Sequence, residues 1–228
     1  MADVNLRRIG LIALAIGVCA VAGMLLIRAH NAPVAVDHRR ARQQVLYYTL
    51  SRVDDPIIVL GDSIVEASTL PRSACGHPIV NAGLNGASTA SDLGNWLAAA
   101  LANKRAAAII VALGTNDALI NSPDEKAFEQ RYGALLGDLS KLTTHLAVLA
   151  IPAIEVRERL TAEMQEEIMP SIDRLNAVLP DIAKRANATL LPLLDMPAPH
   201  TIDGVHLNGA GYRVWDKAIM QGTGPVCG

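Results

Sequence analysis

The chain has 228 residues, of which 51% are hydrophobic, 3% aromatic and 18% charged, and its formal net charge is −2. This length suits one α/β domain with a well-buried core and a short appendage, and it is short for two independent domains. The slightly negative charge provides no basic field for nucleic acid, so a nucleic-acid partner is not expected.

A charge-free apolar segment lies near the N-terminus. Residues 9–27 carry no charge, and at about 1.5 Å per residue a helix of this length nearly spans a bilayer core of about 30 Å. We predict a transmembrane helix within an N-terminal membrane anchor, residues 1–30. The alternative is a cleaved signal peptide, because Ala20 and Ala22 form a small-x-small site, although the apolar run continues beyond it.

Two sequence features disagree about the side of the membrane on which the folded domain lies. Arginines are more numerous after the apolar segment than before it, which by the positive-inside rule places the domain in the cytoplasm. Against this, the two cysteines outside the segment, Cys75 and Cys227, suggest a disulfide in an extracytoplasmic domain, with two unrelated thiols as the alternative. We expect an inner-membrane protein with its domain in the periplasm, or a secreted protein if the N-terminal segment is cleaved.

Residues 31–54 are expected to form a linker and a stalk helix. Residues 37–53 are polar and arginine-rich, and the apolar side chains of Val45, Leu46 and Leu50 give them the pattern of an amphipathic helix. The folded domain is then expected to comprise residues 55–228.

Five short, continuous apolar runs follow, of the kind that is buried on both faces of a parallel sheet. They are residues 56–60, 78–80, 107–113, 146–151 and 189–194. Helical patterns separate most of these runs and end the chain, at residues 89–103, 122–143, 157–188 and 208–220. Strands that alternate with helices of this length predict a five-stranded parallel sheet covered by helices on both faces.

Polar clusters follow four of the five runs, and in a parallel sheet such loops meet at the carboxyl edge of the strands. They are Gly61-Asp62-Ser63, residues 81–86, residues 114–117 and residues 203–206. We therefore predict a reactive site at this edge.

These clusters contain the parts of a serine nucleophile site. A serine hydroxyl needs a base to take its proton and a carboxylate to orient that base. Ser63 follows the first strand, and Asp203 and His206 lie three residues apart on one loop, close enough for the carboxylate to hold the imidazole. We predict that these three residues form a catalytic triad.

Donors for an oxyanion lie in the same clusters. An attacked carbonyl becomes an oxyanion that requires preorganised hydrogen-bond donors. Gly86 can offer a backbone N–H, Asn116 a side-chain amide, and Ser63 its own backbone N–H at the start of a helix. Asp62 and Asp117 are expected to support the loops beneath these groups.

On these four blocks the chain resembles the SGNH hydrolases, also called GDSL-type esterases and lipases, over the whole domain after the stalk. The resemblance implies a flavodoxin-like three-layer α/β/α fold in which Ser63 is the nucleophile, Gly86 and Asn116 complete the oxyanion hole, and Asp203 and His206 close the triad. It implies no metal and no organic cofactor.

The blocks depart from the family pattern at three positions. Ile64 stands where the family name has Leu, and Leu207 follows the histidine where many members have Pro. Thr115 stands where thioesterase-like members commonly carry a second Gly, and this form is more similar to carbohydrate esterases.

The implied fold also bears on the cysteines. In a flavodoxin-like sheet the first and last helices pack on the same face, so Cys75 after the first and Cys227 after the last are expected at the end opposite the active site. We predict that they form a disulfide.

The expected activity is hydrolysis of a carboxylic ester through an acyl-enzyme, with a short acyl group such as acetyl on a cell-envelope carbohydrate. The first alternative is a lysophospholipase or thioesterase that acts on longer acyl chains. The second is a catalytically silent SGNH-like module that binds a glycan. The expected partners are an ester substrate, either glycan or lipid, and the membrane through the N-terminal helix.

Overall fold

The computed structural model describes residues 37–119, 123–157, 160–193 and 195–227. The compact unit runs from His38 to Gly228. Its centre is a sheet of six strands in the order β2-β3-β1-β4-β5-β6. In chain order the strands are β1 (Ile57–Gly61), β2 (Ser73–Ala74), β3 (His77–Gly83), β4 (Ala108–Ala112), β5 (Leu146–Leu149) and β6 (Thr189–Leu191).

The prediction of a five-stranded parallel sheet was wrong, because the sheet is mixed and has six strands. Strands β3, β1, β4, β5 and β6 pair in parallel, whereas β2 pairs antiparallel with β3. The two-residue turn between β2 and β3 has positive φ angles, 51° at Cys75 and 85° at Gly76, as tight hairpins require. A strand of two residues leaves no apolar run or alternation in the sequence, so the pattern could not reveal it.

The predicted membrane span is not among the described elements. In the part of the chain that the structure describes, no helix has the length and apolar character needed to cross a membrane. The transmembrane helix expected at residues 9–27 lies outside the described residues.

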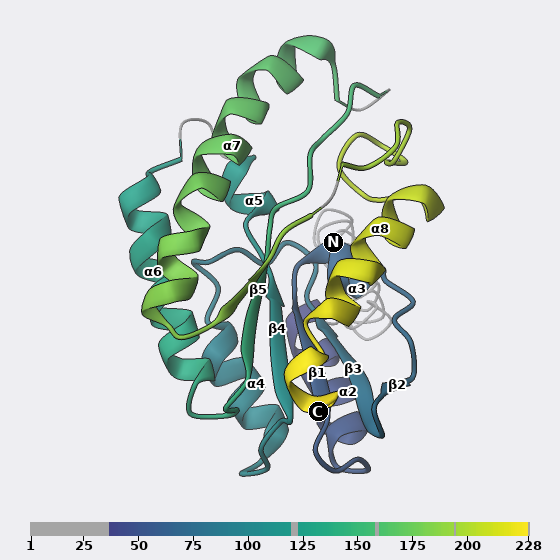
Figure 1. The fold of residues 1–228 in the computed structure, drawn as a ribbon, viewed down its shortest axis with the longest axis vertical. Coiled ribbons are helices and arrows are strands. Elements are labelled where there is room, and N and C mark those ends of the chain that lie inside the picture. The colour runs from purple at the N-terminus through teal and green to yellow at the C-terminus, as the bar shows by residue number, and fades with distance from the viewer. Residues whose placement is uncertain (1–36, 120–122, 158–159, 194, 228) are drawn as a thin grey trace, which may run out of the picture. The chain divides into compact units, whose positions relative to one another are not determined.

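Helices cover both faces of the sheet (Figure 1). One face carries α2 (His38–Leu50), α4 (Leu93–Leu101), α6 (Glu125–Leu139) and α7 (Ala162–Arg185). The other carries α3 (Ser63–Glu66) and α8 (Gly209–Gln221), and the short helices α5 (Thr115–Ala118) and α9 (Gly224–Cys227) complete the unit. The two faces follow from the alternation of side chains along a strand. On β1, Ile58 and Leu60 join the core under the first face, and Ile57 and Val59 join the core under the second.

The segment expected to be a stalk contributes to the domain. Leu46 and Leu50 of α2 are buried, and α2 packs against α4. Arg42 of α2 also donates hydrogen bonds to the Gly83 carbonyl at the end of β3, at 2.9 and 3.1 Å. The apolar side of this amphipathic helix therefore covers the sheet.

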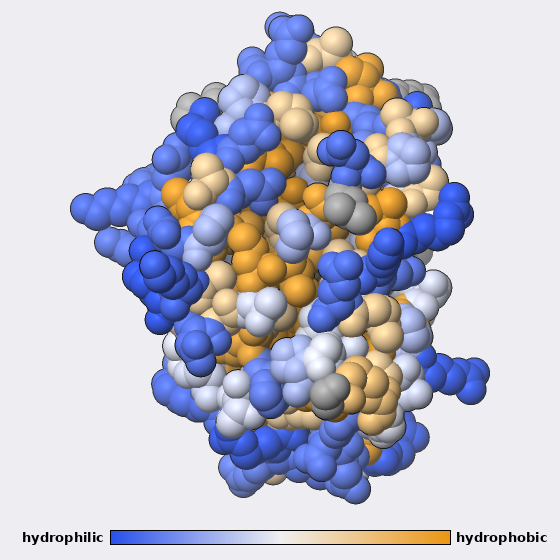
Figure 2. Space-filling view, in the orientation of Figure 1, coloured by the Kyte–Doolittle hydropathy of each residue, from blue (hydrophilic) through white to orange (hydrophobic). Residues whose placement is uncertain are grey.

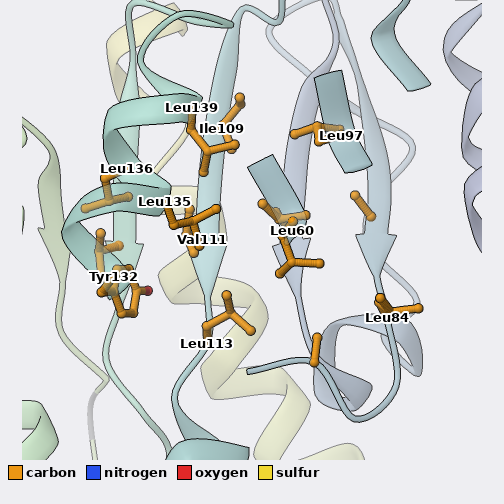
Figure 3. Close-up of a cluster of buried hydrophobic side chains, with 14 of the residues drawn as sticks. Leu60, Leu84, Leu97, Ile109, Val111, Leu113, Tyr132, Leu135, Leu136 and Leu139 are labelled. Carbon is orange, nitrogen blue, oxygen red and sulfur yellow. The ribbon is translucent and has the colours of Figure 1, made fainter. Parts of the chain in front are cut away.

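The larger core lies between the sheet and the four helices α2, α4, α6 and α7. Figure 3 shows side chains of α6 packed against β4, with Leu60 of β1 and Leu97 of α4 beside them. The rings of Phe128 and Tyr132 meet edge to face, with centroids 5.4 Å apart. This packing fixes the carboxyl ends of β1 and β4, from which the polar loops emerge.

Candidate active site

Ser63 lies at the junction between β1 and α3, as its first helical residue. A side chain at Gly61 would collide with the backbone oxygen of Ala112 and with Val65, so glycine permits β1 to pass closely between its neighbours. Asp62 caps α3 by accepting a hydrogen bond from the Ile64 N–H at 2.9 Å. The nucleophile candidate therefore stands on a short, tightly packed turn at the carboxyl edge of the sheet.

Ser63, His206 and Asp203 form one hydrogen-bonded chain. The Oγ of Ser63 lies 2.9 Å from Nε2 of His206, and Nδ1 of His206 lies 2.8 Å from Oδ2 of Asp203. The other carboxylate oxygen of Asp203 accepts hydrogen bonds from the backbone N–H groups of Val205 and His206, at 3.1 and 2.9 Å. The serine can therefore donate to the imidazole while the imidazole donates to the carboxylate.

Asp203 is held in its ionised form. Burial on its own raises the pKa of this carboxyl, but hydrogen bonds from the backbone and ring of His206 and from the Val205 N–H outweigh it and lower the pKa to about 2. A carboxylate at this place fixes the tautomer of His206 and stabilises the imidazolium that forms when the ring takes a proton.

The loop that carries Asp203 and His206 is closed upon itself. The Ile202 N–H donates to the His206 carbonyl at 2.8 Å, and Gly204 between them has a φ of 104°, which favours glycine. The side chain of Asn208 caps α8 and also donates to the Pro199 carbonyl at 2.8 Å. These contacts give the base and its carboxylate a defined path from β6 to α8.

Two further predicted residues lie on neighbouring loops. Asn116 is in α5, directly after β4, and its side-chain amide donates one hydrogen to the Ala87 carbonyl at 2.8 Å. An amide nitrogen has a second hydrogen, which remains available for a ligand. Gly86 is exposed with a φ of 74°, and a side chain there would meet open space. The Gly86 and Asn116 loops are thus joined through Ala87.

The model of the GDSL-like lipase/acylhydrolase family matches residues 59–214, which include the predicted triad and the predicted oxyanion donors Gly86 and Asn116. The chain belongs to this family. It is accordingly a serine ester hydrolase that acts on carboxylic esters. No curated protein sequence matches the chain.

Several solved structures share the fold. A putative platelet activating factor from Streptococcus pneumonia is 24% identical with a TM-score of 0.68, and the match covers 91% of this chain and 98% of that one. A member of the lipolytic G-D-S-L family from Veillonella parvula is 18% identical with a TM-score of 0.58, over 73% and 96% of the two chains. A variant acetylxylan esterase from Geobacillus stearothermophilus is 17% identical with a TM-score of 0.56, over 75% and 94%.

Asp117 connects the loop that follows Gly86 to the short helix that carries Asn116. Its side chain is 2% exposed and accepts hydrogen bonds from the backbone N–H and the hydroxyl of Thr89, at 3.0 and 2.5 Å. Arg131 lies 3.6 Å from the same carboxylate and donates to the Thr89 hydroxyl at 3.0 Å. Asp117 therefore fixes the loop after Gly86 against the helix of Asn116, and Arg131 balances its charge.

Asp62 is the second buried carboxyl at the site. Its side chain is 2% exposed, and burial raises its pKa to about 6, although the hydrogen bond from Ile64 opposes this. It accepts hydrogen bonds from Ile64 in the turn beneath Ser63 and from the Thr115 side chain, so it supports the nucleophile from below.

Cys75 and Cys227 form a disulfide in the structure. Cys75 lies in the hairpin before β3, at the amino end of that strand, and Cys227 ends α9. The bridge is therefore at the edge of the sheet opposite Ser63. Within the described residues, no three His, Cys, Asp or Glu side chains are grouped as metal ligands.

Sequence reasoning missed Glu155, in the loop between β5 and α7. Its carboxylate accepts hydrogen bonds from His200 and Thr201, at the start of the triad loop. The only signal in the sequence was its position after the fourth apolar run, since the loops after such runs meet at the reactive edge.

Proposed function

We propose that the chain removes short acyl groups, such as acetyl, from a carbohydrate through an acyl-enzyme on Ser63. The observation that carries the mechanism is the chain from Ser63 to His206 to Asp203, with distances of 2.9 and 2.8 Å. Such a chain activates a hydroxyl that is otherwise a poor nucleophile.

In the proposed mechanism, Oγ of Ser63 attacks the ester carbonyl carbon while its proton moves to Nε2 of His206. The carbonyl oxygen becomes an oxyanion, to which the N–H groups of Ser63 and Gly86 and the amide of Asn116 donate. Collapse of this intermediate breaks the bond to the alcohol, which leaves with the proton from His206. A water then gives its proton to His206 and attacks the acyl carbon. The bond from that carbon to Oγ of Ser63 breaks, His206 returns its proton to Oγ, and the acid is released.

Three observations support a short acyl group on a carbohydrate. The acetylxylan esterase from Geobacillus stearothermophilus shares the fold. The block around Asn116 begins Gly-Thr, the form that is more similar to carbohydrate esterases. The His206 side chain is 41% exposed and Gly86 is also exposed, so a bulky alcohol such as a glycan can reach the reacting atoms from solvent.

One observation favours a second candidate, an esterase or thioesterase for longer acyl chains. A cavity of about 370 Å³ lies at the carboxyl ends of β5 and β6. Pro152, Met169, Leu193 and Met196 form much of its wall, and Figure 2 shows apolar residues gathered on the same face between α7 and α8. The apolar side of this cavity suits an acyl chain, whereas Asp173, Asn176, Asp195 and His200 make the rest of its wall polar.

We also propose that the domain works in an oxidising compartment outside the cytoplasm. The disulfide between Cys75 and Cys227 supports this, because such bonds persist where thiols are not kept reduced. Alkylation of free thiols in protein taken directly from its native cells tests it. Full labelling of both cysteines would argue for a reducing compartment.

The function is tested with 4-nitrophenyl esters of acetate and octanoate, using the full chain and its Ser63→Ala variant. The proposal expects faster turnover of acetate, and loss of at least about 10⁴-fold in kcat in the variant, because the nucleophile is removed. Preference for octanoate would favour the long-chain candidate. Equal rates for the two proteins would instead indicate a module that only binds.

A further inference from the structure

Glu155 binds the triad loop through several atoms at once. Its Oε2 accepts hydrogen bonds from the His200 N–H at 3.0 Å, the Thr201 N–H at 2.8 Å and the Thr201 hydroxyl at 2.6 Å. Arg157 lies 3.5 Å from the same oxygen. The side chain of Glu155 is only 14% exposed. One carboxylate therefore fixes two residues of the loop, His200 and Thr201, just before Asp203.

The remaining atoms of Glu155 reach the same loop. Its Oε1 lies 3.1 Å from Nδ1 of His200, whose other ring nitrogen lies 3.1 Å from the Ala153 carbonyl. The backbone N–H of Glu155 donates to the Gly204 carbonyl at 2.9 Å. Asp203 lies between the two attachment points, at residues 200–201 and 204.

We propose that Glu155 is a positioning residue for catalysis, which holds the loop of Asp203 and His206 in register with Ser63. The inference rests on the function proposed above. It follows from a difference in how the parts of the site are built. Ser63 is fixed by the packing of a strand and a helix, whereas the described residues between β6 and α8, 192–193 and 195–208, belong to neither kind of element. The hydrogen bonds within this loop shape it, and its contacts with Glu155 fix where it lies relative to Ser63.

The charge of Glu155 suits this role. Burial raises its pKa, but hydrogen bonds from the Thr201 hydroxyl and N–H and from the His200 N–H outweigh it, and the net effect lowers the pKa below its ordinary value. Hydrogen bonds to a carboxylate are shorter and stronger than those to a neutral acceptor. Because both oxygens face the loop, Glu155 acts through the position of the loop and not on the reacting atoms.

Glu155→Ala and Glu155→Gln separate this role from a purely structural one. In Glu155→Ala the loop loses its acceptor, and a displacement of His206 of about 1 Å lowers kcat by about 100-fold with little change in KM. In Glu155→Gln the amide oxygen still accepts from Thr201 and His200, so most of kcat is retained. Glu129→Ala is the matched control, because Glu129 pairs with Arg185 on the surface between α6 and α7.

The readouts are kcat, KM and the rate at which a fluorophosphonate modifies Ser63, measured well below the Tm of each variant. The inference expects kcat and the rate of modification to fall together in Glu155→Ala and to recover in Glu155→Gln. It is overturned if folded Glu155→Ala matches the wild type, or if both variants lose Tm while the modification of Ser63 keeps its rate.

Thr201→Val covers the case in which Glu155→Ala does not fold. This substitution removes one hydrogen bond to Glu155 and leaves the carboxylate in place. A lower kcat in Thr201→Val supports the inference, and an unchanged kcat overturns it. If Ser63→Ala keeps its activity, the proposed function fails. If Ser63→Ala is inactive and the Glu155 variants are unaffected, only this inference fails.

Discussion

The two ends of the sheet are held together by different means. Here the carboxyl edge is the side of the sheet at the carboxyl ends of the parallel strands, and the amino edge is the opposite side. At the carboxyl edge, Ser63, His206 and Asp203 are placed by hydrogen bonds between loops that are far apart in the sequence. At the amino edge, a covalent bond joins Cys75 to Cys227, which are 152 residues apart. The geometry of the carboxyl edge depends on individual hydrogen bonds, and that of the amino edge depends on one disulfide. Changes at the two edges should therefore separate activity from stability.

The largest effect is expected at the carboxyl edge, from His206→Ala. The variant lacks the group that takes the proton of Ser63, and by analogy with other serine hydrolases kcat falls by up to about 10⁶-fold. The free energy of unfolding should change little, because the His206 side chain is 41% exposed. Ester hydrolysis and urea denaturation of the same preparation test both statements. A large fall in the free energy of unfolding of His206→Ala would contradict the expectation that changes at the carboxyl edge affect activity and leave stability unchanged.

The next effect is expected at the amino edge, from Cys75→Ser combined with Cys227→Ser. Loss of a cross-link that closes so long a loop lowers the free energy of unfolding by up to about 5 kcal/mol in the chain-entropy model. The kcat of the folded variant at 25 °C should remain that of the wild type, because the bridge is remote from Ser63. Wild-type protein treated with a reductant is the control, and its free energy of unfolding should equal that of the double variant. A large fall in kcat would show that the amino edge also shapes the active site.

The sequence revealed much of the architecture because its apolar runs are continuous. All five parallel strands lie within or overlap the predicted runs, and β1, β4 and β5, which are buried throughout, contain only apolar residues and glycine. The sequence did not reveal β2, whose two residues carry no pattern. It also left the role of residues 37–53 open, because an amphipathic helix has the same pattern whether it is a stalk or, like α2, covers a sheet.

The sequence predicts those site residues that come directly after a strand. Ser63 and Asn116 come directly after apolar runs, and the structure brings their loops to one edge. Glu155 could not be found in this way, because its function depends on where the chain from β6 to α8 passes. That path is set by hydrogen bonds between side chains and backbone, which leave no periodic signal. The contacts of Asp117 with Thr89 were hidden for the same reason.

The smallest expected effect tests the buried carboxyl beneath the nucleophile, through Asp62→Asn. The amide oxygen of Asn can still cap α3 by accepting from Ile64, so the local geometry should be kept. What changes is the charge. The pKa of Asp62 is raised to about 6 from 3.8, so the folded protein binds a proton that the unfolded chain has already lost between these pH values. Its contribution to stability is therefore full below pH 4 and is lost as the pH rises to about 6.

Asp62→Asn should lack this dependence of stability on pH. Asp62→Asn and the wild type should have similar free energies of unfolding at pH 4, and the variant should be more stable by up to about 3 kcal/mol at pH 8, which corresponds to the rise in pKa. Urea denaturation at several pH values from 4 to 8 measures the difference. A constant difference over this range would show that Asp62 ionises normally in the folded protein. The buried turn beneath Ser63 would then be more accessible to water than its 2% exposure indicates.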